Sequence, residues 1–238
     1  MFIQANQYVI PTQQHDYPEW HRGRERYALW YLTVQNLALE RYLQELKQQF
    51  SDVLFRPNTR QFHITLYICG FYAAKKYWED DFLESQFKQQ VQALRQMQLK
   101  PFQLKVGGIN SFDSALFVKV RDQSQQLAHI RQALGVGGAE IAALQYHPHI
   151  TSGLYQTACS TNLILQRIQN LPVHYFDLDI QHLNFGYYQA HTLQGQLFST
   201  HQFPLEHMRF NLFWAVRVRV KAVWLSKPRS NLANPSFM

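Results

Sequence analysis

Apolar and polar positions alternate between strand-like and helix-like runs through the first hundred residues. The run RYALWYLTV (26–34) is rich in aromatic and branched side chains, which is typical of a buried strand. Apolar residues then recur at helical spacing over 37–50, with charged and glutamine side chains between them. FHITLYICGF (62–71) predicts a second strand. Residues 81–97, which open with acidic side chains and end before Pro101, predict a second helix.

A hairpin and a helix come next, and from residue 146 the chain again has a strand followed by a helix and further strands. FQLKVGGINSF (102–112) and SALFVKVRD (114–122) flank a short polar turn and predict an antiparallel hairpin. Residues 123–134 predict a helix that the glycines of GVGG close. This glycine cluster lacks the lysine of a phosphate-binding loop and follows a helix where such a loop follows a strand. One more strand, one helix and two long strands are expected at 146–155, 161–171, 174–188 and 192–205.

Three segments are expected from this pattern. Residues 1–25 form a polar, irregular leader, and residues 26–206 form one α+β domain whose two halves each carry strands and helices. Residues 207–238 form a basic C-terminal extension. Within it, NLFWAVRVRVKAVWLSKP (211–228) alternates apolar and basic side chains in strand fashion. An added edge strand is the favoured interpretation, and an RNA or membrane contact is the alternative.

The formal charge of +7 comes mainly from that extension. It contains six basic and no acidic residues, so the remaining chain has 23 − 6 = 17 basic against 16 acidic residues, or +1. A nearly neutral body with a basic tail favours a local anion site over a long nucleic-acid groove.

The composition predicts a soluble cytoplasmic protein. Hydrophobic residues make up 46% of the chain and aromatic residues 15%, which suffices for a sizeable core. The cysteines, Cys69 and Cys159, are too few for a disulfide framework and have no metal-site spacing. The N-terminal residues lack the pattern of a secretory signal, and the apolar runs are shorter than the roughly 18 residues of a membrane span.

The chemistry-bearing feature is a repeated tripeptide, His-Ile-Thr. Of the eleven histidines, only His63 and His149 are followed two residues later by a serine or threonine. Residues i and i+2 of a strand share one face about 6.6 Å apart, so His63 lies beside Thr65 and His149 beside Thr151. A single such match is usually structural. Two matches in similar apolar runs, one in each half of the chain, favour a functional pair.

Two imidazoles and two hydroxyls on one surface suit phosphodiester chemistry. One imidazole takes a proton from water while the other gives a proton to the leaving oxygen. The hydroxyls of Thr65 and Thr151 donate to the phosphate oxygens. This mechanism requires neither a metal nor a cofactor. The sequence contains no HExxH, paired CxxC or GxSxG motif, so zinc and serine-hydrolase sites have no support.

These motifs resemble those of the two-histidine (2H) phosphoesterase superfamily, which includes 2'-5' RNA ligase-like proteins and 2',3'-cyclic phosphodiesterases. HITLYICG (63–70) resembles the first family motif and HPHITSG (147–153) the second. The resemblance implies two pseudo-symmetric lobes of antiparallel sheet flanked by helices, with a central cleft. It also implies a metal-independent phosphodiesterase that acts on a 2',3'-cyclic phosphate or a 2'-5' linkage in RNA or a small nucleotide. We expect the protein to be a monomer.

The second motif departs from the family pattern. Ser152 replaces the usual leucine, and Leu154 stands where an arginine that contacts phosphate or RNA is common. Arg22 and Arg24 are candidate replacements, although a solvated basic turn is the simpler interpretation.

Two tyrosines continue the lines of the motifs along their strands. Tyr67 and Tyr155 are candidates for stacking on a base or ribose, and core packing is equally consistent with their positions.

Alternative functions remain open on the sequence alone. Within the same fold they are a 3'-5' RNA exonuclease and a phosphodiesterase for 2'-5' or cyclic oligonucleotides. Outside catalysis, the missing arginine and the basic tail are also consistent with a non-catalytic RNA- or nucleotide-binding module.

Overall fold

The computed structural model describes residues 2–13, 15–141 and 145–205, so the expected extension at 207–238 lies outside the described residues. The described strands form one nine-stranded sheet in the order β7-β4-β5-β6-β2-β1-β8-β9, with β3 beside β2. All pairings are antiparallel except that of β2 with β3. The strands are β1 Arg26–Thr33, β2 His63–Ala73, β3 Asp81–Leu83, β4 Phe102–Ser111, β5 Ala115–Arg121, β6 His149–Leu154, β7 Tyr175–Ile180, β8 His182–Gln189 and β9 Leu197–Pro204.

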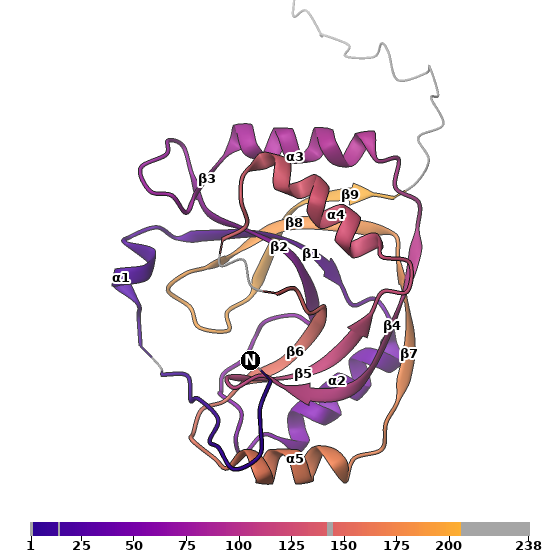
Figure 1. The fold of residues 1–238 in the computed structure, drawn as a ribbon. Helices are drawn as coiled ribbons and strands as arrows, with labels where there is room; N and C mark the ends of the chain where they lie inside the picture. Colours follow the sequence, from indigo (N-terminus) through magenta and orange to yellow (C-terminus); the bar gives the residue numbers. More distant parts are fainter. Residues whose placement is uncertain (1, 14, 142–144, 206–238) are drawn as a thin grey trace, which may run out of the picture. The chain divides into compact units, whose positions relative to one another are not determined.

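The described helices flank this sheet, which confirms the expected α+β class. Figure 1 shows α3 and α4 on the side of the molecule that holds β8 and β9, and α2 and α5 on the side that holds β4 and β5. In the sheet itself, α4 contacts β2 and α2 contacts β6. Among the residues that the structure describes, no helix combines the length and apolar character that crossing a membrane requires. The helices are α1 Pro18–His21, α2 Leu37–Gln49, α3 Glu84–Gln96, α4 Gln126–Leu134 and α5 Thr161–Gln169, with a 3-10 turn, η1, at Gly135–Gly137.

Local sequence explains where the main elements begin. The α2 helix starts at Leu37 because the side chain of Asn36 accepts a hydrogen bond from the Leu39 N–H at 3.0 Å. The helix expected from residue 81 begins at Glu84 instead. Residues Asp81–Leu83 are extended as β3, and the Asp81 carboxylate accepts hydrogen bonds from two backbone N–H groups of the preceding turn.

The two lobes are not the two halves of the chain. β6 continues into the β5-β4-β7 lobe, and β2 continues into the β1-β8-β9 lobe. The hairpin β4–β5 therefore comes from the first half of the sequence but joins the second motif. The strand expected at 174–188 is broken at Gln181, so that β7 pairs with β4 while β8 pairs with β1. Periodicity predicted these strands, but it carries no information about which partner each strand takes.

The lobes meet at the pairing of Ile64 in β2 with Ile150 in β6. Leu32 pairs with Ile64 on one side, and Val118 pairs with Ile150 on the other. All four side chains have zero exposure, so the row that joins the lobes is part of the core. The residues on either side of each isoleucine must therefore face the opposite surface of the sheet.

The leader is packed onto the domain. Ile3 and Val9 are buried, and their N–H groups donate to the carbonyls of Ser111 and Cys159. The leader also contains the short helix α1, which the polar pattern did not predict.

Candidate active site

The two His-Ile-Thr tripeptides meet across the β2–β6 pair. Because Ile64 is level with Ile150 in an antiparallel pair, the register sets His63 level with Thr151 and Thr65 level with His149. Residues directly opposite each other have Cβ atoms about 4.5–5.5 Å apart, and diagonal neighbours about 7–8 Å apart. All four polar side chains are half-buried. The structure thus brings together the four residues that the sequence proposed.

Backbone carbonyls hold both imidazoles in the same way. Nδ1 of His63 donates to the carbonyl of Gln61 at 2.8 Å, and Nδ1 of His149 donates to the carbonyl of His147 at 2.6 Å. A carbonyl oxygen only accepts, so the proton of each neutral ring is on Nδ1. Nε2 of each ring therefore keeps a lone pair for proton transfer.

Burial lowers the pKa of both histidines. For His63 the pKa falls to about 4, mainly through burial, with further lowering by the positive charges of Arg60 and His149. For His149 the lowering also comes first from burial, and His147 adds to it. In both residues the hydrogen bond to the carbonyl opposes the shift. Both rings are therefore neutral at pH 7 before an anion binds.

Aromatic rings set the orientation of each histidine. The Tyr31 ring lies edge-on to His63, with centroids 5.9 Å apart. His149 meets Phe112 and Phe117 edge-on at 4.9 and 5.2 Å. These contacts restrict ring rotation, so each Nε2 has a fixed direction.

Tyr67 and Tyr155 do not join the polar face. Leu66 is bulged out of the β1–β2 pairing, so Thr65 pairs with Tyr31 while Tyr67 pairs with Trp30 on the other surface. The Tyr67 ring is 5% exposed, and its hydroxyl donates to the carbonyl of Gly138 at 2.6 Å. Tyr155 is fully buried, with its hydroxyl 2.6 Å from Oγ of Ser111. Both positions favour core packing over stacking on a substrate.

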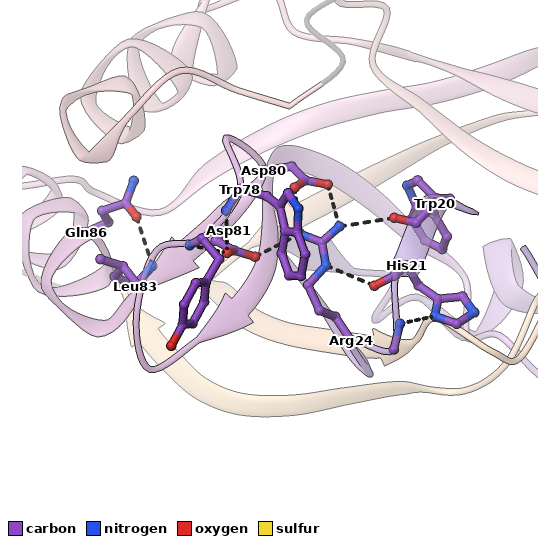
Figure 2. A network of polar contacts seen from close by, with 10 residues as sticks. Trp20, His21, Arg24, Trp78, Asp80, Asp81, Leu83 and Gln86 are labelled. Carbon is purple, nitrogen blue, oxygen red and sulfur yellow. Dashed lines mark hydrogen bonds and ion pairs between the residues drawn. The ribbon is translucent and has the colours of Figure 1, made fainter. Parts of the chain in front are cut away.

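Arg24 belongs to a closed network of polar contacts (Figure 2), which includes neither His63 nor His149. Its guanidinium forms ion pairs with Asp80 and Asp81 at 2.6 and 2.8 Å and lies 3.8 Å from the Phe71 ring centroid. Phe71 is eight residues beyond His63 along β2, which is roughly 26 Å of extended chain. With both carboxylates bound to it, Arg24 is not available as the missing phosphate contact.

Arg22 lies in the same region as Arg24. It is exposed, and its Cζ lies 5.5 Å from the Trp78 ring centroid. This placement favours the solvated basic turn over a phosphate contact.

Two cations near the histidines were missed by the sequence analysis. Arg60 precedes His63 by three residues and stacks on Tyr188. Lys119 in β5 pairs with His149, so its side chain shares that face of the sheet. The proximity of Arg60 to a motif was visible in the sequence, but the position of Lys119 depends on the strand pairing.

One group of described residues has the composition of a metal site. Asp16, His21 and His191 each offer a ligand atom, and these atoms lie within 4.8 Å of one another. Nδ1 of His21 accepts a hydrogen bond from the Gly23 N–H, so Nε2 carries the proton and donates it to Asp16 at 2.8 Å. A metal ligand needs a free lone pair on that nitrogen. The donor set therefore fits a structural hydrogen bond rather than a metal ion.

Taken together, a helix-flanked antiparallel sheet with two paired histidines and threonines defines the two-histidine phosphoesterase class. The model of the 2'-5' RNA ligase superfamily matches residues 35–192, and the chain belongs to this superfamily. A search among curated proteins found no match.

Solved structures agree on the fold. LigT of E. coli in complex with 3'-AMP has a TM-score of 0.55 at 11% identity, over 76% of this chain and 98% of that one. TT0787 of Thermus thermophilus has a TM-score of 0.53 at 12% identity, over 77% and 99%. A further phosphoesterase has a TM-score of 0.52 at 11% identity, over 76% and 99%. At these identities the likeness establishes the fold alone.

Proposed function

We propose that this protein is a metal-independent phosphodiesterase that acts on a 2',3'-cyclic phosphate or a 2'-5' linkage in RNA or a small nucleotide. The observation that carries the proposal is the matched pair of histidines. Each is held at Nδ1 by the carbonyl two residues earlier, and each has a threonine two residues later on the same face. A pair of similar proton carriers across one strand pairing suits hydrolysis of a phosphodiester, in which one group takes a proton from water and the other gives a proton to the leaving oxygen.

The reaction with a cyclic phosphate uses both rings in one step. Nε2 of one histidine takes a proton from water as the water oxygen bonds to phosphorus. The protonated second histidine gives its proton to the ribose oxygen as the bond from that oxygen to phosphorus breaks. The hydroxyls of Thr65 and Thr151 donate to the non-bridging oxygens, where charge accumulates. The product is a phosphomonoester.

The surroundings of the rings suggest how the roles divide. The charge of Arg60 lowers the pKa of His63, which favours the neutral ring. We therefore assign His63 as the base and His149 as the acid in the hydrolytic direction. A phosphate anion between the rings raises the pKa of His149 and so supports its protonated form. In the reverse direction the two roles exchange.

The nucleotide nature of the substrate has separate support. A structure of similar fold, LigT of E. coli, was crystallised with 3'-AMP, a ribonucleotide whose phosphate is at a position that opening a 2',3'-cyclic phosphate would leave. The near-neutral charge of residues 1–206 also suits a small anionic ligand.

A substrate panel in the presence of EDTA tests the proposal. It contains 2',3'-cyclic mononucleotides, ADP-ribose cyclic phosphate, 2'-5' oligoadenylate, cyclic dinucleotides and short RNAs. We expect turnover of at least one member with EDTA present and its loss in both His63→Ala and His149→Ala. Activity that chelation abolishes and added zinc, manganese or magnesium restores would contradict the two-histidine mechanism. Binding without turnover across the panel would favour a nucleotide-binding module.

A further inference from the structure

Leu154 leaves the second motif without its usual cation. In this structure Leu154 is a half-buried strand residue that pairs with Ala115, and its N–H donates to Oε1 of Gln194 at 3.0 Å. A phosphodiester brings a negative charge to the site, and the rings of His63 and His149 are both neutral at pH 7 before it binds. A cation for that charge has to come from another element.

Arg60 has a guanidinium that is held in place but not neutralised. Its Nε donates to the carbonyl of Gly195 at 3.2 Å, and its Cζ lies 4.3 Å from the ring centroid of Tyr188. Among the described residues, its terminal nitrogens meet no hydrogen-bond acceptor and its charge meets no carboxylate. Burial also lowers the pKa of Arg60 from its usual value. A half-buried charge without a counter-ion favours the binding of an anion.

The contacts of Arg60 place it on the face that carries the histidines. Tyr188 packs against a small cluster of buried side chains that includes Tyr31 and Leu197. Tyr31 in turn lies edge-on to His63 at 5.9 Å between ring centroids. The positive charge of Arg60 also acts on His63 directly, because it contributes to lowering the pKa of that ring. These contacts put Arg60 on the same face as His63 and in its neighbourhood, as binding of a common anion requires.

Gln61 fixes both Arg60 and His63. Its side chain acts like a strand partner of Leu197, because Oε1 accepts from the Leu197 N–H at 2.9 Å and Nε2 donates to the Leu197 carbonyl at 3.3 Å. Its own carbonyl accepts from Nδ1 of His63. One residue thus fixes the loop that holds Arg60 and the ring that faces the phosphate, which makes Gln61 a positioning residue.

Resting on the function proposed above, we propose that Arg60 is the phosphate-binding cation of this site. Its terminal nitrogens donate to the non-bridging oxygens of the phosphate held between His63 and His149. The planar guanidinium gives two parallel hydrogen bonds, which a lysine does not reproduce.

Phosphate binding and a histidine titration test the proposal without turnover. The dissociation constant of inorganic phosphate is measured by calorimetry, and the pKa of the His63 ring is followed by NMR. Arg60→Gln is expected to weaken phosphate binding about 10- to 100-fold, as loss of hydrogen bonds to a charged group does. It should also raise the pKa of His63, because a neighbouring positive charge disappears. A residue that only supports the fold would not move that pKa.

Arg26→Gln is the matched control. Arg26 stacks on Tyr187 with its Cζ 5.3 Å from the ring centroid, whereas Arg60 stacks on the adjacent residue Tyr188. Neighbouring strand residues face opposite surfaces, so the control loses a similar contact on the other side of the sheet. Phosphate affinity and the His63 pKa should both stay unchanged. Arg60→Lys, which keeps the charge, should leave the His63 pKa low and weaken phosphate binding less than Arg60→Gln.

Two results would overturn the proposal. The first is a folded Arg60→Gln variant that binds phosphate as tightly as the unmodified protein. If Arg60→Gln does not fold, unchanged phosphate affinity in Arg60→Lys has the same meaning. The other is loss of affinity in Lys119→Gln without loss in the Arg60 variants, which would make Lys119 the cation. If phosphate binding depends on Arg60 but no phosphodiester is turned over, the anion site stands and the proposed hydrolysis fails.

Discussion

The site around His63 and the site around His149 have the same backbone arrangement but different neighbours. Both rings donate from Nδ1 to the carbonyl two residues earlier, and both tripeptides bury the central isoleucine completely. His63, however, lies near the cation Arg60, whereas His149 packs against two phenylalanine rings. The same local arrangement thus fixes the same tautomer in both histidines. The strands and loops around the two rings differ, so the rings are chemically unequal.

The inequality follows from which elements surround each ring. The first motif is preceded by a loop that is tied to the β8–β9 turn, and this loop brings Arg60 to His63. The second motif lies beside β5, which supplies Phe117 and Lys119. The proposed division into base and acid therefore depends on the tertiary neighbours of each ring, and the following changes test it.

The largest effect is expected from the histidines themselves. His63→Ala and His149→Ala should each lower kcat about 10²- to 10⁴-fold, which is the usual contribution of general acid–base catalysis. The measurement is turnover of the best substrate in the EDTA panel. His129→Ala, on the exposed face of α4, is the control and should leave turnover unchanged. A large loss in one motif only would mean that the second ring does not act in catalysis.

Substitution of the buried isoleucine in the middle of each motif should lower the stability of the protein. Ile64→Ala and Ile150→Ala are each expected to lower the free energy of unfolding by about 2–5 kcal/mol, because each leaves a cavity in a fully buried row. Denaturant titration measures the loss. Ile10→Ala is the control, since Ile10 is 59% exposed. If the histidine variants unfold and the isoleucine variants do not, the assignment of faces is wrong.

The threonines should have an intermediate effect on catalysis. Thr65→Ala and Thr151→Ala each remove one hydrogen bond to a charged phosphate, so kcat/KM should fall about 10- to 100-fold. Serine at either position should restore most of the activity, because it keeps the hydroxyl. Thr157→Ala, at an exposed position outside the motifs, should have no effect. If the alanine and serine variants at position 65 or 151 have equal kinetics, the hydroxyl at that position does not contribute to catalysis.

The pH dependence should reveal the inequality of the rings. Both pKa values are lowered, that of His63 to about 4. Activity is lost at low pH when the base is protonated and at high pH when the acid is neutral. The profile of kcat/KM, which reports the free enzyme, should therefore be a bell with its maximum below pH 6.5. A flat profile from pH 5 to 9 would contradict paired acid and base roles.

The smallest effect is expected from the tyrosines that follow the motifs. Tyr67→Phe and Tyr155→Phe each remove a hydrogen bond inside the protein, so each should lower the free energy of unfolding by about 0.5–1.5 kcal/mol. Thermal or denaturant unfolding measures this loss. KM should not change, because neither ring reaches the polar face. A several-fold rise in KM without loss of stability would indicate that the tyrosine contacts the substrate after all.

The sequence by itself determined most of the local elements and pointed to the four candidate site residues that the structure brings together. Strand and helix runs follow from short-range periodicity, and a spacing of two on a strand is enough to place each histidine beside its threonine. The shared Nδ1 geometry also follows from local structure, since its acceptor is two residues away in both motifs. These features depend on contacts within a few residues, which a sequence pattern encodes directly.

The tertiary structure alone decided the partners. Strand pairing placed β4 and β5, from the first half of the chain, in the lobe of the second motif. The bulge at Leu66 turned Tyr67 to the surface of the sheet opposite the histidines. Packing placed Arg24 in ion pairs with Asp80 and Asp81. It also brought Arg60 beside His63. Each of these outcomes depends on strand pairing or loop packing between distant segments. Hydrophobic periodicity specifies which face of an element is buried but not which element covers it, so one sequence carries no direct record of such contacts.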